Sequence, residues 1–245
     1  MRIVETLIIA LTVFTGCKKN DMQSNFSPIT PTVANTQLVG DTILADTVTY
    51  LALGDSYTIG EAVPVADSYP YQLSAQLKAN KLKAGIPKVI AQTGWTTSDL
   101  INAVSTANLN TKYSFVTLLI GVNNQYQHFD PEAYRTGFDQ LVNTAISHAK
   151  GGKKNVFVLS IPDYSVTPFA KNSDTQLISS QIAQYNAINQ GESLRLGVNY
   201  TDITPISLQA KNDLSLITND GLHPSGKMYT LWVQQLLPQV LAKLR

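Results

Sequence analysis

The sequence has few of the residues on which several common kinds of site depend. Cys17 is the only cysteine among the 245 residues, so the chain cannot form an internal disulfide or a site built on paired thiolates. A P-loop lysine motif and a His-x-x-x-His pair are both missing. These absences argue against nucleotide-phosphate and zinc chemistry, and we expect the protein to use neither a metal nor an organic cofactor.

Neither positive nor negative charge predominates in the sequence. The 18 Lys and Arg residues nearly balance the 17 Asp and Glu residues, which leaves a net charge of +1 without long basic or acidic runs. Such a distribution provides no electrostatic footprint for nucleic acid. We therefore expect a neutral small molecule or polymer as the partner, and no nucleic acid.

Long apolar runs are lacking at the N-terminus, where the apolar segment covers residues 7–14. A membrane-spanning helix needs roughly 20 apolar residues, so this segment instead indicates a secretory signal, with Arg2 ahead of it and small residues before Cys17. FTGC at residues 14–17 resembles the bacterial lipobox, whose cysteine becomes the lipidated first residue of the mature protein. We expect Cys17 to anchor the protein in the bacterial cell envelope, facing the periplasm or the exterior.

Three segments are predicted along the chain. Residues 1–17 are the signal peptide with its lipobox. Residues 18–46 are rich in Ser, Thr, Asn and Pro, a composition typical of a flexible tether with an r.m.s. reach of about 30 Å at this length. Residues 47–245 are long enough to form one catalytic domain with a substantial core.

The last segment alternates short β-rich apolar runs with longer helical stretches, which indicates βαβ units and a mostly parallel sheet. Continuous apolar runs are expected for strands that are buried on both faces. Five strands are predicted, at residues 49–53, 88–91, 115–120, 155–161 and 198–202. The sequence thus predicts a flavodoxin-like three-layer α/β/α sandwich with a central five-stranded parallel sheet in the strand order 2-1-3-4-5.

Helix starts support this arrangement. Asp130 followed by Pro131 is typical of an N-cap with proline at the first helical position, and Asp174 begins a second helix. The apolar stripes of these helices predict packing against the core. We expect Pro238 to kink or end the final helix.

Unusual polar clusters follow the predicted strands. GDS at residues 54–56 comes after the first strand, Gly94 after the second and Asn123 after the third, while DGLHP at residues 220–224 precedes the last helix. Each cluster alone is what an ordinary turn uses. Ligands of open α/β sheets bind beyond the carboxyl ends of the strands, so together the clusters predict a site at that edge.

These four blocks, in this order, resemble the SGNH (GDSL) hydrolase family, from residue 48 to the end of the chain. The resemblance implies an ester hydrolase with Ser56 as nucleophile and with Asp220 and His223 completing the triad. It also implies an oxyanion hole formed by Ser56, Gly94 and Asn123. The family commonly has Gly-x-Asn-Asp where this chain has GVNN, a departure that affects the hydrogen bonding of the loop more than the amide that catalysis needs.

The chemistry of the residues supports the same roles. A serine hydroxyl needs an adjacent base to become a nucleophile at neutral pH, and the chain has three histidines. A surface position is the simpler interpretation of His148, late on a helix, and a loop or rim position that of His128. His223 has the carboxylate of Asp220 three residues earlier, which can accept from Nδ1 and set the tautomer.

Other polar and aromatic residues near the strand ends have weaker predicted roles. Asp55 is expected to shape the turn, and Asn123 could stabilise its own loop instead of binding an oxyanion. Trp95 either forms a pocket wall or packs in the core. Three tyrosines either line a sugar or lipid groove or are surface aromatics: Tyr57, Tyr126 and Tyr164.

The predicted function is hydrolysis of a carboxylic ester through an acyl-serine intermediate, on a small-acyl, carbohydrate-ester or lipid-ester substrate. Two alternatives stay open: a catalytically silent module that binds glycan or lipid at the envelope, and an acyltransferase or thioesterase of the same fold. A silent module would be expected to lack a triad residue, and none is missing here. A flavodoxin-like cofactor carrier would leave Asp220 and His223 unexplained.

Overall fold

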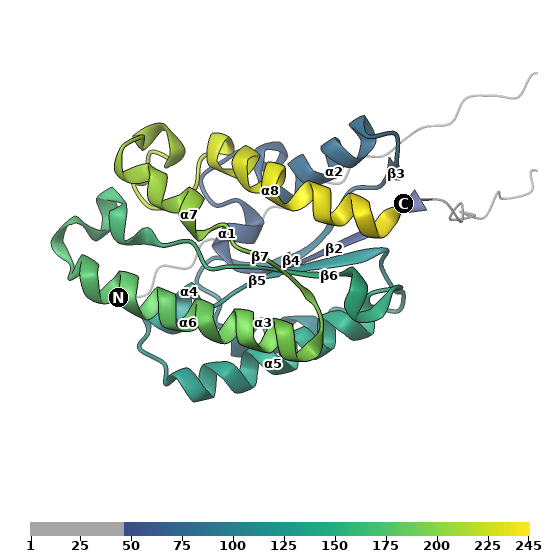
Figure 1. The fold of residues 1–245 in the computed structure, drawn as a ribbon, viewed down its shortest axis with the longest axis horizontal. Helices are drawn as coiled ribbons and strands as arrows, with labels where there is room; N and C mark the ends of the chain where they lie inside the picture. Colours follow the sequence, from purple (N-terminus) through teal and green to yellow (C-terminus); the bar gives the residue numbers. More distant parts are fainter. Residues whose placement is uncertain (1–46) are drawn as a thin grey trace, which may run out of the picture. The chain divides into compact units, whose positions relative to one another are not determined.

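A computed structural model of the protein describes residues 47–245. The predicted signal peptide at 1–17, the predicted tether at 18–46 and the lipidation site Cys17 lie outside the described residues. Figure 1 shows a central sheet between two layers of helices, which confirms the predicted three-layer architecture.

The central sheet contains five parallel strands in the spatial order β4-β2-β5-β6-β7. Numbered along the chain, this is the predicted order 2-1-3-4-5. Strands β2, β5 and β6 are buried along their whole length, as their continuous apolar runs indicated. The bounds are β2 (Tyr50–Gly54), β4 (Lys88–Ala91), β5 (Phe115–Leu119), β6 (Val156–Leu159) and β7 (Asn199–Thr201).

The register of the strands aligns their carboxyl ends. Gly54, the last residue of β2, is paired with Ala91 of β4 on one side and with Leu119 of β5 on the other. The loops that leave these three strands therefore start side by side. This alignment places the GDS, Gly94 and Asn123 blocks at one edge of the sheet.

A second, two-stranded parallel pairing joins β1 (Thr47–Val48) to β3 (Lys83–Ala84). The sequence analysis did not predict it, because two residues are too few to show a period. Thr47 is in register with Lys83 at the amino end of the sheet. The described part of the chain therefore begins beside β3.

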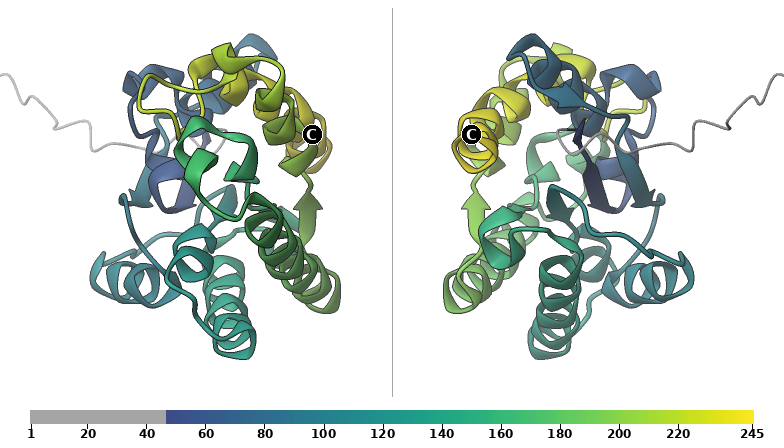
Figure 2. Two further views of the ribbon diagram at one scale, coloured as in Figure 1. Left: turned by 90° about the vertical axis from the view of Figure 1, so that its left-hand side faces the viewer. Right: turned by 90° about the vertical axis from the view of Figure 1, so that its right-hand side faces the viewer.

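The helices form the two outer layers. Helices α2 and α8 lie on one face of the sheet, and α3, α5 and α6 cover the other (Figures 1 and 2). The bounds of the longer helices are α2 (Tyr69–Ala79), α3 (Thr97–Thr106), α5 (Pro131–His148), α6 (Thr175–Leu196) and α8 (Gly226–Leu244). Shorter elements are α1 (Ser56–Ile59), α4 (Val122–Tyr126), α7 (Thr204–Ser207) and the 3-10 turns η1 (Val65–Asp67), η2 (Gly152–Asn155), η3 (Tyr164–Val166), η4 (Pro168–Asn172), η5 (Leu208–Lys211) and η6 (Leu214–Leu216).

Both predicted N-caps are confirmed. The Asp130 carboxylate accepts from two N–H groups of the first turn of α5 at 2.9 and 3.1 Å. Asp174 accepts from the N–H of Leu177 at 2.9 Å at the start of α6. Within residues 47–245, no helix is both long enough and apolar enough to cross a membrane.

The last helix does not end at Pro238 but continues to Leu244. Proline removes the hydrogen bond to the carbonyl of Gln234, yet both residues are exposed, so water can satisfy that carbonyl. Leu236 and Val240, on either side of the proline, are fully buried. Packing of these side chains holds the helix past the proline.

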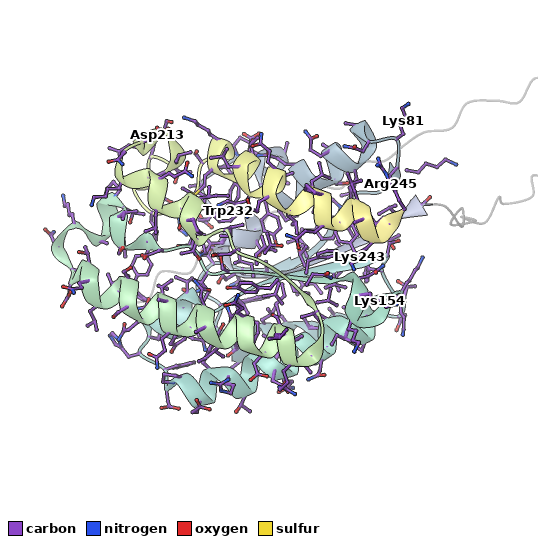
Figure 3. The ribbon with its side chains drawn as sticks, in the orientation of Figure 1. Lys81, Lys154, Asp213, Trp232, Lys243 and Arg245 are labelled. Carbon is purple, nitrogen blue, oxygen red and sulfur yellow. The ribbon has the colours of Figure 1, made fainter. Side chains whose placement is uncertain are left out.

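Aromatic packing connects the core with the carboxyl edge of the sheet. Trp232 of α8, labelled in Figure 3, is fully buried. Its ring centroid lies 5.0 Å from that of Tyr229 and 6.3 Å from that of Tyr57. The core therefore supports the residue that directly follows Ser56.

Candidate active site

Ser56 is the first residue of α1, directly beyond β2. A side chain at Gly54 would collide with the Leu119 carbonyl of the neighbouring strand, so glycine is needed for the turn to pack there. The Asp55 carboxylate accepts from the N–H of Tyr57 at 3.0 Å, which confirms that Asp55 shapes the turn. Ser56 is 5% exposed at the carboxyl edge of the sheet.

Asp55 is also an unusual carboxyl group. It is almost completely buried, and its Oδ2 has no hydrogen-bond partner among residues 47–245. Burial raises the pKa of Asp55 to about 7, although backbone N–H groups of Tyr57 and of Asp55 itself act in the opposite direction. A substantial fraction of this carboxyl group is therefore protonated near neutral pH.

His223 and Asp220 are in direct contact. The distance from His223 Nδ1 to Asp220 Oδ2 is 2.6 Å. The other carboxylate oxygen accepts from the N–H groups of Leu222 and His223 and from the Thr218 hydroxyl, at 2.8, 3.0 and 2.6 Å. Gly221, with φ at +76°, closes the turn between the two side chains.

These contacts determine the charge of Asp220. Partial burial acts to raise the pKa of this carboxyl group, but the hydrogen bonds from Thr218, from the backbone and from the His223 ring outweigh it and hold the pKa well below its usual range. An ionised carboxylate at this distance favours the tautomer that carries its hydrogen on Nδ1, and in that tautomer Nε2 is free to accept a proton.

Tyr57 brings the serine and histidine blocks together. Its ring lies edge-on to the His223 ring, with centroids 5.9 Å apart and an interplanar angle of 65°. Tyr57 is only 3% exposed, so it supports the histidine from behind and does not line a groove. Within residues 47–245 no hydrogen bond joins the Ser56 hydroxyl to His223; in enzymes such bonds often tighten only when substrate is bound.

Gly94 and Asn123 face each other across neighbouring loops. Asn123 lies in α4, directly beyond β5, and its Nδ2 donates to the carbonyl of Trp95 at 2.9 Å. An amide nitrogen carries two N–H groups, so one is left for a ligand. Gly94 has φ at +84° and open space where a side chain would be. Trp95 is partly buried and packs against the core.

Asn124 stands where the family pattern has aspartate, and its contacts show that it has a structural role. This side chain is fully buried. Its Oδ1 accepts from the N–H of Thr97, and its Nδ2 donates to the Thr97 hydroxyl, both at 3.0 Å. Asn124 therefore ties α4 to the first turn of α3, and asparagine satisfies both Thr97 groups.

A cleft of about 80 Å³ opens beside Asn123. Tyr126 and Phe169 at its rim are 56% and 46% exposed, with ring centroids 6.2 Å apart. The sequence indicated Tyr126 and Tyr164 but not Phe169, which comes close because its N–H donates to the Gly221 carbonyl at 2.9 Å. The lining residues are Val122, Asn123, Tyr126, Tyr164, Phe169 and Leu222.

Sequence reasoning also missed Thr218, whose hydroxyl bonds Asp220. A threonine two residues before the carboxylate carries no distinctive signal, and only the folded turn shows the contact. Tyr164 is largely buried, and its hydroxyl donates to Gln125 at 3.0 Å. It therefore forms the floor of the cleft.

The other two histidines lie apart from this arrangement. His128 is exposed in the loop after α4, as expected for a rim position. His148 ends α5, and its carbonyl accepts from the N–H of Tyr113 near the amino end of β5. No cluster of three or more His, Cys, Asp and Glu side chains in the described part of the chain is placed to hold a metal ion.

Comparisons with known proteins identify a matching family and similar folds. The model of the GDSL-like Lipase/Acylhydrolase family matches residues 52–231. The crystal structure of TesA is similar, with a TM-score of 0.63 at 14% identity, covering 80% of this chain and 99% of that one. The comparison with curated proteins finds no match.

Two further solved structures have the same fold. The acetylxylan esterase Axe2 from Geobacillus stearothermophilus has a TM-score of 0.59 at 18% identity, covering 79% of this chain and 94% of that one. A lipase/acylhydrolase from Enterococcus faecalis has a TM-score of 0.62 at 17% identity, with coverages of 81% and 97%.

Proposed function

The chain belongs to the GDSL-like lipase/acylhydrolase family and is a serine ester hydrolase, and we propose that it cleaves esters through an acyl-serine intermediate on Ser56. The 2.6 Å contact between Asp220 and His223, at the same edge of the sheet as Ser56, is the observation that supports this most strongly. It is the arrangement that a serine nucleophile requires.

In the proposed first step, His223 Nε2 takes the hydroxyl proton while Ser56 Oγ attacks the ester carbonyl carbon. The bond between that carbon and the alcohol oxygen then breaks, and the alcohol leaves with the proton from His223. Water attacks the acyl-serine in the second step, again giving its proton to His223, and the acid leaves as Ser56 regains its proton. Asp220 stays ionised and stabilises the charged imidazole in both steps.

Each tetrahedral intermediate places negative charge on the former carbonyl oxygen. The proposed donors are the backbone N–H groups of Ser56 and Gly94 and the side-chain amide of Asn123. The open space at Gly94 and the second N–H of Asn123 support this assignment, because an oxyanion needs donors that are already positioned.

The proposed substrate is a small-acyl ester, a carbohydrate ester or a lipid ester. The exposed rings of Tyr126 and Phe169 beside Asn123 provide an apolar surface against which a sugar ring or an alkyl chain could pack. The similar Axe2 is described as an acetylxylan esterase. Hydrolysis of p-nitrophenyl esters of increasing acyl length, measured beside acetylated xylan and lysophospholipid, distinguishes these classes.

Labelling with a fluorophosphonate tests the nucleophile. We expect stoichiometric labelling at Ser56, and we expect Ser56→Ala to abolish both labelling and hydrolysis while circular dichroism shows an intact fold. Ser165→Ala is a matched control, because Ser165 is also a buried serine but lies in η3, beyond β6, and has no proposed role in catalysis. Labelling of another serine, or a folded wild-type protein that reacts with neither probe nor ester, would overturn the assignment and favour a silent binding module.

Hydrolysis and acyl transfer are separated by following the acyl group. We expect free acid as the main product when a sugar is present as a second acceptor, because the cleft is open to solvent at its rim. Retention of the acyl group on the added sugar would instead identify an acyltransferase.

We further propose that Cys17 is lipidated and anchors the protein in the cell envelope. The short apolar segment that ends in small residues ahead of the only cysteine supports this. In cell fractions washed with about 0.5 M salt, which screens surface charges, the wild-type protein should remain with membranes and Cys17→Ser should be released. A Cys17→Ser protein that withstands this wash, or an unmodified thiol in the mature wild-type protein, would contradict the anchor.

A further inference from the structure

Most of the cations of residues 47–245 lie at one end of the sheet and most of the acidic side chains at the other. Figure 3 shows Lys81, Lys154, Lys243 and Arg245 at one end and Asp213 at the other. The basic face, as we define it, consists of exposed residues at the amino ends of the strands: Lys78, Lys81, Lys83, Lys88, Lys112, Lys150, Lys153, Lys154, Lys243 and Arg245. Apart from Asp139 and Glu192, the acidic residues of this range lie in elements at the carboxyl ends of the strands.

Contacts between distant segments hold the basic face together. Arg245 donates to the carbonyl of Asn80 at 3.5 Å, which connects the end of α8 to the loop after α2. The N–H of Lys150 donates to the carbonyl of Tyr113 at 2.7 Å, beside Lys112. These contacts join the ends of α2 and α8, and bring the segments of Lys112 and Lys150 together.

The basic face carries charge that the described acidic residues do not neutralise. The ion pairs found in residues 47–245 involve Arg135, Arg195, Lys227 and His223, and none involves a residue of the basic face. Such a concentration of cations at one end gives a local positive potential in spite of the nearly neutral chain.

Exposed apolar side chains accompany the cations. The two most exposed large hydrophobic residues are Leu194, at 82%, and Ile86, at 78%. Ile86 lies in the loop from β3 to β4, between Lys83 and Lys88, and Leu194 lies near the end of α6. Cations around an exposed apolar side chain are typical of a surface that binds the headgroup region of a bilayer.

We propose that the basic face docks on an anionic lipid bilayer. The covalent path toward Cys17 leaves the described domain at this same end, because Thr47 is in register with Lys83. Cations and exposed Ile86 together fit a bilayer better than a nucleic acid, which would use the charge but not the apolar side chain. Docking in this way would turn the Ser56 edge away from the bilayer, which, given the proposed function, favours esters outside the docked membrane as substrates.

The test uses the full chain with Cys17→Ser, so that no acyl group contributes to binding. Sedimentation with vesicles of phosphatidylcholine alone, or with about 30% phosphatidylglycerol, should show binding only to the anionic vesicles and loss of binding at high salt. Lys83→Gln with Lys154→Gln should weaken that binding by about 30-fold, since each lysine near an anionic surface contributes about fivefold. The control Lys171→Gln with Lys211→Gln removes the same charge from the opposite end and should have little effect.

Orientation is tested with a single cysteine in the same background, which has no other thiol. A polarity-sensitive dye on Ile86→Cys should shift to shorter wavelengths on anionic vesicles, whereas the dye on Leu214→Cys, which is 61% exposed near the opposite end, should not. Thermal unfolding by circular dichroism checks that each variant is folded, so a loss of esterase activity does not affect the result.

Three outcomes would overturn the proposal. Equal weakening in both lysine pairs would show that net charge, rather than this face, causes binding. Equal dye shifts at both positions would show that the domain binds in another orientation. Binding of duplex DNA at the same salt, without a dye shift at Ile86→Cys on vesicles, would assign the basic face to a polyanion instead.

Discussion

Two adjacent asparagines allow a sharp test of the oxyanion hole. Asn123 points its amide toward the loop of Gly94, whereas Asn124 is fully buried and bonded twice to Thr97. If Asn123 stabilises the oxyanion, its hydrogen bond strengthens only as charge develops. Asn123→Ala should therefore lower kcat by about 10² to 10³ with little change in KM.

Asn124→Ala should lose more stability than Asn123→Ala, although it should lose less activity. Asn123→Ala removes one hydrogen bond, to the Trp95 carbonyl, and should cost about 1 kcal/mol of unfolding free energy. Asn124→Ala removes two hydrogen bonds and leaves the Thr97 N–H unpaired, which should cost about 2–4 kcal/mol. For a domain of this size that is a fall in Tm of about 5–15 °C. Below its own Tm, Asn124→Ala should keep kcat within a few-fold.

Steady-state kinetics on p-nitrophenyl acetate measure kcat and KM of both variants, and thermal unfolding measures their stability. Asn124→Asp is a further control, because aspartate can still accept from both Thr97 groups and should be tolerated. A stable Asn123→Ala protein with nearly normal kcat would remove Asn123 from the oxyanion hole. A large loss of kcat in Asn124→Ala without loss of stability would show that the two roles had been assigned the wrong way round.

Two further predictions concern the pair of His223 and Asp220 and the buried carboxyl group of Asp55. Hydrolysis should suffer more in His223→Ala than in Asp220→Ala, because the base transfers protons whereas the acid orients it; equal activities in folded proteins would refute these roles. Asp55 has its pKa raised from 3.8 to about 7, so its stabilising contribution is complete below the ordinary pKa and is lost as the pH rises through 7, by about 4 kcal/mol in total. Urea unfolding between pH 4 and pH 8 should therefore show a weaker pH dependence in Asp55→Asn than in the wild-type protein, and identical slopes would contradict this.

Local patterns in the sequence were sufficient to predict the architecture and the contact between Asp220 and His223. The continuous apolar runs of β2, β5 and β6 predict buried parallel strands, and the N-caps at Asp130 and Asp174 depend only on neighbouring residues. Asp220 and His223 lie three residues apart around Gly221, so their contact is almost local. These features could be predicted because the residues that form them are close along the chain.

Contacts between distant segments could not be predicted in this way. Phe169 reaches the cleft through a hydrogen bond to the Gly221 carbonyl. Tyr57, for which the sequence leaves a groove or a surface position open, is instead buried and packs against His223. The helix α8 continues past Pro238 because Leu236 and Val240 are buried. Their burial depends on how α8 packs on the sheet. No periodicity in the sequence contains this information.

The charge distribution illustrates the same division. By itself the sequence determined a net charge of +1 without long runs, together with acidic residues at helix starts, such as Asp99 and Glu132, and basic residues at helix ends, such as Lys78 and Lys243. Each preference is local, because acids favour the positive end of a helix dipole and cations the negative end. Only the parallel βαβ topology places these helix ends at the same edge of the sheet as the loops and strand starts that carry most of the other cations, and so forms one basic face opposite the candidate active site.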